Sequence, residues 1–330
     1  MASRYRKIVI PLDGSLLAEQ VFAYVQQLTS PATTELVLVT ILEPWRFIPY
    51  PGEPRALPPV DPMRTSAETY LACQYEQWQS LGYQVYIYLG EGDAAHEILG
   101  VAESSGADLI AMTTHGRSGF ERWTLGSVAE RVIQGAKLPI LLVREATQVR
   151  SNQLQRLLIP LDGSTWAEGA LPQAQALAQA TGAQILLLQV IQSLDEGSQQ
   201  ILFEDKAVAN TVYKDWRAHA EEYLSQVAQR LQIANVSSDY RVLWGDPDKV
   251  ICKAVTDENI DLLVMSTHGR SGLSRWFYGS VANKVLRNAP CPLLLIRSIQ
   301  SSTGLSPASG RQNMPNDNNT METNPEGGIQ

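Results

Sequence analysis

Cysteine and long apolar runs are scarce in this 330-residue chain. Its three cysteines, Cys73, Cys252 and Cys291, lie far apart without paired spacing, so the sequence predicts neither a disulfide framework nor a thiolate zinc site. No apolar run approaches the roughly 20 residues that span a bilayer, and the short run that begins at Lys7 is too brief for a signal peptide. We therefore expect a cytoplasmic protein that does not contact membranes.

Basic charge and enzyme motifs are also lacking. Lysine and arginine number 26 against 34 acidic residues, for a net charge of -8, whereas nucleic-acid-binding surfaces are basic. None of the four histidines belongs to a His-x-x-x-His pair, and the chain has no Gly-x-x-x-x-Gly-Lys-Ser/Thr loop and no Gly-x-Ser-x-Gly elbow. The sequence thus predicts no nucleic-acid partner, no protein-held metal ion and no catalytic residue.

The chain does contain one motif that occurs twice. Residues 113–119 read Thr-Thr-His-Gly-Arg-Ser-Gly and are followed, after an Arg-Trp pair, by Gly-Ser-Val at 126–128. A second copy at 266–272 keeps every spacing and leads to Gly-Ser-Val at 279–281. Each copy lies between a buried-looking strand and a helical pattern, where glycine lets a ligand approach the backbone and the helix N-terminus favours anions. The duplication predicts two similar domains, each with an anion site.

Alternating strand and helix patterns predict an α/β fold with two parallel five-strand sheets flanked by helices. The expected strands are residues 7–13, 35–42, 83–89, 108–112 and 139–144, and then 157–162, 184–191, 238–244, 261–265 and 292–297. We expect the first domain at 1–146, a linker at 147–155, the second domain at 156–298 and a disordered tail, poor in apolar residues, at 299–330.

The two halves differ after their second strands. Residues 44–62 hold seven prolines together with Trp45, Phe47 and Tyr50, which predicts an extended loop without regular structure. This loop either lies permanently on its own domain or covers a ligand as a lid. The second half has no proline at the corresponding place. A long helix follows there, and its apolar residues at helical spacing predict a core-facing stripe. They are Val212, Trp216, Tyr223, Val227 and Leu231.

Each half has a strand that ends in aspartate and, later, a small-x-x-Gly turn that is followed after nine residues by Gly-Ser. In a five-strand α/β unit, this pattern resembles the universal stress protein family in its tandem form. The resemblance covers about residues 5–298. It implies a Rossmann-like or flavodoxin-like strand order and two halves that pair through their last strands as an intrachain pseudo-dimer. A homodimer and unidentified protein partners remain open.

The resemblance also implies ATP, with magnesium or manganese, in one or both halves. Glycines and serines of the motif would hold the phosphates, Asp13 and Asp162 would face ribose or metal, and Ile41 and Val190 would line the adenine slot. The implied residues in the first half are Pro11, Asp13, Ile41, Met112, Thr113, Gly116, Arg117, Gly126, Ser127 and Val128. Those in the second half are Pro160, Asp162, Val190, Met265, Ser266, Gly269, Arg270, Gly279, Ser280 and Val281.

Simpler interpretations stay open for several of these residues. The aspartates, each followed by Gly-Ser, are also typical of a turn that leads into a capped helix, and Arg117 and Arg270 are equally consistent with solvated loop residues. The nucleotide-binding branch of the family has glycine where this chain has Thr113 and Ser266. A hydroxyl at that position would either crowd the nucleotide or donate a hydrogen bond to it.

Three functions are consistent with these patterns. The first is a stress-response regulator that binds ATP, acts through nucleotide-dependent conformation or partner binding, and hydrolyses ATP slowly at most. The second is a nucleotide-free scaffold of the same fold that acts by protein contact. The third is an adenylate-forming enzyme, but such enzymes usually carry a Ser-Gly-Gly-x-Asp-Ser loop or a His-x-Gly-His pair, and the sequence has neither.

Overall fold

The computed structural model describes residues 4–43, 60–114, 125–144, 153–192, 206–267 and 279–297. The first half has the order β1 (Lys7–Pro11), α1 (Leu16–Glu19), α2 (Val21–Leu28), β2 (Glu35–Leu42), α3 (Val60–Ser80), β3 (Gln84–Glu91), α4 (Ala94–Ser104), β4 (Leu109–Thr113), α5 (Ser127–Gly135) and β5 (Ile140–Val143). The second half repeats it with β6 (Arg156–Pro160), α6 (Thr165–Glu168), α7 (Leu171–Thr181), β7 (Gln184–Ile191), α9 (Lys206–Ile233), β8 (Ser238–Trp244), α10 (Pro247–Asp257), β9 (Leu262–Ser266), α11 (Ser280–Asn288) and β10 (Leu293–Ile296).

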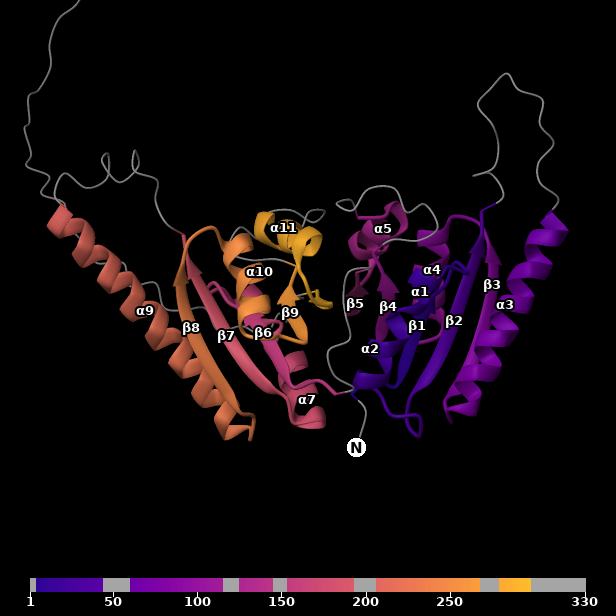
Figure 1. The fold of residues 1–330 in the computed structure, drawn as a ribbon, viewed down its shortest axis with the longest axis horizontal. Helices are drawn as coiled ribbons and strands as arrows, with labels where there is room; N and C mark the ends of the chain where they lie inside the picture. Colours follow the sequence, from indigo (N-terminus) through magenta and orange to yellow (C-terminus); the bar gives the residue numbers. More distant parts are fainter. Residues whose placement is uncertain are drawn as a thin grey trace, which may run out of the picture. The chain divides into compact units, whose positions relative to one another are not determined.

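The strands of each half form a parallel sheet with helices on both faces (Figure 1). Their order is β3-β2-β1-β4-β5 in the first half, and the second half repeats it as β8-β7-β6-β9-β10. The predicted α/β fold is therefore confirmed. Of the two expected strand orders, the structure has the Rossmann type, in which the chain reverses direction across the sheet between β1 and β4.

Alternate strand residues face opposite helix layers. In β1, Ile8 and Ile10 belong to the core under α1, α2 and α3, whereas Val9 belongs to the core under α4 and α5. Because both faces of a parallel sheet are buried, its strands are apolar throughout rather than alternating. This explains why the strands are recognisable in the sequence as short apolar runs.

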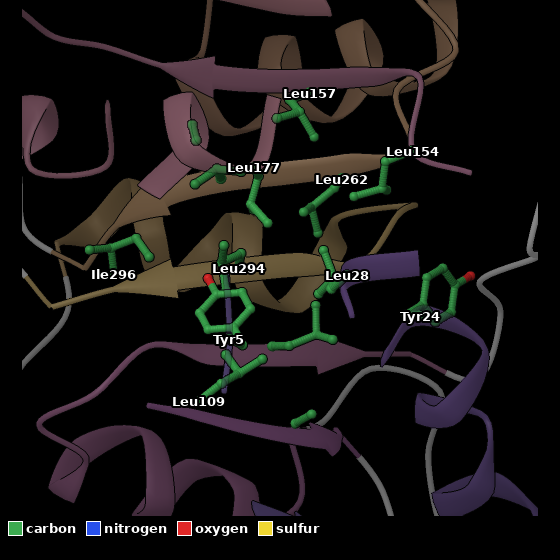
Figure 2. Packing of buried hydrophobic residues seen from close by; sticks show 14 of the residues in the cluster. Tyr5, Tyr24, Leu28, Leu109, Leu154, Leu157, Leu177, Leu262, Leu294 and Ile296 are labelled. Carbon is green, nitrogen blue, oxygen red and sulfur yellow. The ribbon is translucent and has the colours of Figure 1, made fainter. Parts of the chain in front are cut away.

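The last strands of the two halves pair with each other, as the family resemblance implies. β5 and β10 run antiparallel, with Leu141 opposite Leu294, and join the two sheets into one of ten strands. The apolar core continues across this joint: Figure 2 shows Leu109 of β4, Leu294 of β10 and Leu262 of β9 in one layer. Pairing removes two apolar edges that would otherwise be open to other strands.

An arginine after each last strand also binds the opposite half. Nη1 of Arg144 donates to the carbonyl oxygen of Ala289 over 3.2 Å, and Nη1 of Arg297 donates to that of Ala136 over 2.9 Å. Ala289 and Ala136 are the C-cap residues of α11 and α5. A cation at a helix C-terminus satisfies an orphan carbonyl and interacts favourably with the helix dipole, so the two contacts reinforce the strand pairing.

Two expectations are corrected by the structure. The proline-rich segment was expected to be irregular up to residue 62, but α3 already begins at Val60, because proline is tolerated in the first turn of a helix. In α9, Val227 and Leu231 are buried as expected, whereas Trp216 is 40% exposed. The predicted core stripe thus holds only for the later turns of this helix. Among the described residues, no helix combines the length and apolarity needed to cross a membrane.

Candidate functional site

A cavity of about 890 Å³ opens at the carboxyl ends of the strands in the first half. It spans the ends of β1, β2 and β4, the first turn of α5 and one side of α3. In open α/β sheets, ligands bind outside the carboxyl ends of the strands, at the point where the strand order reverses. The cavity occupies this place, and its volume lies within the range of small-molecule sites, roughly 300 to 1,000 Å³.

The cavity brings together most of the site residues expected in the first half. Those that line it are Pro11, Asp13, Ile41, Met112, Thr113, Gly126, Ser127 and Val128. The other two, Gly116 and Arg117, lie outside the described residues, as do the loop at 44–59 with its proposed lid role and the tail. The eight lining residues come from separate segments of the chain, and only the strand order makes them neighbours.

The N-terminus of α5 faces this cavity with glycine as its N-cap. Gly126 has φ -60° and ψ 143°, and no side-chain hydrogen bond caps the helix at this residue. Its own N–H donates to the carbonyl oxygen of Thr114 over 2.8 Å, which fixes the start of the helix against the end of β4. The following N–H groups of Ser127 and Val128 therefore have no capping side chain as acceptor, which is the arrangement that binds anions at helix N-termini.

Asp13 serves the turn after β1 as well as lining the cavity. Its Oδ1 accepts hydrogen bonds from the N–H and the Oγ of Ser15, over 3.0 and 2.6 Å. Ser15 Oγ in turn accepts from the N–H of Ala18 and caps α1. Gly14 between them has φ 79°, a left-handed conformation that glycine adopts without strain. The turn interpretation is thus correct, and it holds the aspartate at the cavity wall.

Sequence reasoning missed one wall of the cavity, which comes from α3. Met63, Ser66, Ala67 and Tyr70 line it. Tyr70 donates to Glu19 Oε1 over 3.0 Å, which ties α3 to α1. A signal was present, because the second half repeats this pair: Tyr223 donates to Glu168 Oε1 over 3.0 Å.

An ion pair fixes α5 against α4. The two guanidinium nitrogens of Arg131 each donate to one oxygen of Asp93, with Nη2 at 2.7 Å from Oδ1. Asp93 also caps α4 by accepting from the N–H of His96 over 2.9 Å. The hydrogen bonds from Arg131 first, and then from His96, lower the pKa of Asp93. The carboxylate therefore stays ionised, and its ion pair with Arg131 joins α4 to α5, the helix that Gly126 caps.

The second half places its expected residues in the same way. Gly279 is the N-cap of α11, again without a side-chain hydrogen bond, and its N–H donates to Thr267 over 3.1 Å. Asp162 Oδ1 accepts from the N–H and Oγ of Ser164 over 2.9 and 2.6 Å. Pro160, Val190, Met265, Ser266, Ser280 and Val281 lie at the ends of β6, β7 and β9 and at the start of α11. Gly269 and Arg270 are outside the described residues.

The two non-glycine positions of the motif are buried in both halves. Thr113 is 7% exposed and Ser266 6%, and Thr113 lies in the cavity wall. Their hydroxyl groups are therefore held within the end of a strand rather than in open solvent. The three cysteines are free thiols, and the described part of the chain contains no cluster of three or more His, Cys, Asp or Glu side chains arranged to hold a metal ion.

Comparison with known proteins gives a consistent result for both halves. The model of the universal stress protein family matches residues 4–144 and again residues 153–297. Universal stress proteins of Methanocaldococcus jannaschii and Thermus aquaticus are each 32% identical to this chain over 141 residues, or 43% of it, and the matches cover 83% and 97% of those proteins. The crystal structure of a universal stress protein from Archaeoglobus fulgidus superimposes with a TM-score of 0.66 at 21% identity, over 89% of this chain and 97% of that one.

Proposed function

Because this chain belongs to the universal stress protein family with two copies of the family domain, we propose that it is a stress-response regulator that binds ATP in one or both halves. In this proposal, ATP carries magnesium or manganese, and its binding changes the conformation of the protein or its choice of protein partner. The protein acts in the cytoplasm and needs no catalytic residue.

One observation carries the proposal: the glycine-capped N-terminus of α5, Asp13 and Ile41 all line one cavity of about 890 Å³. These groups match the three parts of a nucleotide. N–H groups at a helix N-terminus favour phosphate, a carboxylate can accept from ribose hydroxyls or contact a cation, and an apolar strand end provides a surface for a base.

In this proposal, the helix N-terminus and the loop of the motif bind the phosphates. The N–H groups of Ser127 and Val128 donate hydrogen bonds to phosphate oxygens, and Gly126, which has no side chain, leaves room for the phosphate to approach them. Gly116 and Arg117, and their counterparts Gly269 and Arg270, complete the phosphate contacts. The bound nucleotide itself supplies the charge that attracts the divalent cation.

Mass spectrometry of small molecules released when the purified protein is denatured tests this function directly. We expect adenine nucleotide in the released fraction, and calorimetric titration with Mg-ATP should show binding to protein from which nucleotide has been removed. If no nucleotide is released and titration gives no heat, the proposal is wrong. A nucleotide-free scaffold would then be the better account.

We also expect little turnover of bound ATP. Backbone N–H groups hold phosphates without activating water, and both carboxylates that line the described part of the cavity already bind the chain itself. Oδ1 of Asp13 accepts two hydrogen bonds from Ser15, and Oε1 of Glu43 accepts one from the N–H of Ala94 over 3.4 Å, so we expect neither to act as a general base. A phosphate-release assay with excess Mg-ATP measures this. Sustained turnover on the order of 10 per second, an ordinary enzyme rate, would contradict a regulatory role.

A further inference from the structure

Strand β3 ends the sheet on the side of the first half, and the middle of this strand is apolar. Among the described strands, it pairs with β2 alone. Tyr86, Ile87 and Tyr88 are 44%, 51% and 38% exposed, and no charged residue lies between Val85 and Gly90. An edge strand exposes unpaired N–H and C=O groups that other strands can bind, and proteins usually protect such an edge with charge or proline. This part of β3 has neither.

Strand β8 ends the sheet on the other side, and it does carry charge. The register of the sheet places Asp239, Tyr240 and Arg241 where β3 has its three exposed residues. Arg241 lies 2.9 Å from Asp239 and 4.0 Å from Glu258. Pairing at this edge would remove water from charges that already have partners within the chain. Of the two edges of the described sheet, the β3 edge is therefore the better suited to bind another strand.

The backbone groups that β3 presents outward belong to its odd-numbered residues. The N–H of Gly92 donates to the carbonyl oxygen of Leu42 in β2 over 3.1 Å, so the even-numbered residues point toward β2. Successive residues of a strand direct their backbone groups to opposite sides. Val85, Ile87 and Leu89 consequently direct their N–H and C=O groups away from the sheet, toward a further strand.

We propose that β3 pairs antiparallel with β3 of a second copy of this chain, about a two-fold axis at Ile87. A two-fold axis perpendicular to a sheet keeps each face on its own side, so residues opposite each other are both odd or both even. With the axis at Ile87, this residue faces Ile87 of the partner subunit, and Tyr86 faces Tyr88 of the partner subunit. Aromatic pairs across strands are stabilising, and the register places no charge opposite a like charge.

The chain already uses this kind of pairing once, between β5 and β10. There, two equivalent uncharged strands run antiparallel, and Leu141 lies opposite Leu294, its equivalent in the other half, as a pseudo-two-fold axis at these two residues requires. Pairing at β3 would extend the ten-strand sheet into a second molecule. One strand from each copy buries less than the roughly 1,200 Å² of a standard interface, so we expect a dimer that dissociates on dilution.

Sedimentation velocity of the full chain over a wide concentration range tests the proposal. We expect a monomer–dimer equilibrium in the wild type and loss of the dimer in Ile87→Lys, because the axis places the two introduced charges directly opposite each other. Tyr240→Lys, at the equivalent register position of β8, is the control for a lysine at the other edge and should leave the equilibrium unchanged, with thermal unfolding confirming that the variant is folded. Ile87→Glu alone should also be monomeric, but an equimolar mixture of Ile87→Lys and Ile87→Glu should restore a heterodimer, which also shows that both variants are folded.

Each outcome of the sedimentation experiment leads to a different conclusion about the interface. A wild type that stays monomeric at every concentration overturns self-pairing and leaves the edge to a strand of a different protein. A dimer that persists in Ile87→Lys places the contact elsewhere. Loss of the dimer in Tyr240→Lys alone assigns it to β8, and a mixture of the two charge variants that stays monomeric rules out an axis at Ile87.

Discussion

Replacing Gly126 with valine should lower the affinity of the first half for ATP about tenfold to a hundredfold. A hydrogen bond from a backbone N–H to a charged phosphate oxygen is worth roughly 1.5 to 3 kcal/mol. Valine adds an isopropyl group at the N-cap of α5, where the cavity is lined by Gly126, Ser127 and Val128. The added group would keep phosphate from the N–H groups of the first helical turn.

The conformation of Gly126 makes this substitution a clean test. Its φ of -60° and ψ of 143° are extended values that valine adopts without strain, so the joint between β4 and α5 should survive. Gly100→Val in α4 is a matched control, because a Cβ added at Gly100 meets no atom within 4 Å outside its chain neighbours and its own helix backbone, and Gly100 is not among the cavity residues. The affinity of this control for ATP should equal that of the wild type.

Isothermal titration with Mg-ATP, supported by thermal unfolding of each variant, gives the measurement. Gly279→Val makes the same change in the second half, where the N-cap has φ -54° and ψ 148°. A loss confined to Gly126→Val would assign binding to the first half, and a loss confined to Gly279→Val to the second. Unchanged affinity when both glycines are replaced together would refute the proposed phosphate site.

Much of the local structure was accessible from sequence because its causes are local. The bounds of β2 and β7 agree with the expected strands, since a strand buried on both faces is a short apolar run between turn residues. The helix caps Ser15 and Asp93 were likewise predictable. Each accepts an N–H bond from the residue three positions later, which depends only on chain spacing.

The missing wall of the cavity has a non-local cause. Tyr70 and Met63 reach the site because α3 packs across β2 and β3, and the repeated Tyr–Glu pair links α3 to α1 without indicating that α3 borders a cavity. The same limit explains Trp216, which continues the apolar spacing of α9 but is 40% exposed. Periodicity identifies the apolar side of a helix, whereas the length over which that side is covered depends on the neighbouring strands.

The joint between the halves was predictable for a different reason. Both last strands are apolar without an internal charge, and such strands need a partner if they lie at an edge. The strand order that puts them at edges was available through the family resemblance alone. Sequence composition thus indicates that these strands need a partner, and the strand order determines that each is the partner of the other.

Replacing Leu141 or Leu294 with alanine should lower the free energy of unfolding by about 2 to 5 kcal/mol each, the usual cost of truncating a buried leucine. Both side chains are 0% exposed, and they lie directly opposite each other across β5 and β10. Their removal therefore opens cavities in a core to which both halves contribute. Denaturant unfolding of the full chain measures each change.

The double variant tests the joint itself. If Leu141 and Leu294 are in contact, the two losses should depart from additivity by about 0.5 to 3 kcal/mol, whereas distant sites add within about 0.5 kcal/mol. Leu38→Ala in β2, also at 0% exposure, is the control. Combined with Leu294→Ala, it should give a simple sum, because β2 and β10 are separated by β1, β4 and β5 in the sheet. Additive losses in the Leu141→Ala/Leu294→Ala variant would show that the last strands are not paired in solution, and the two halves would then be independent domains on a linker.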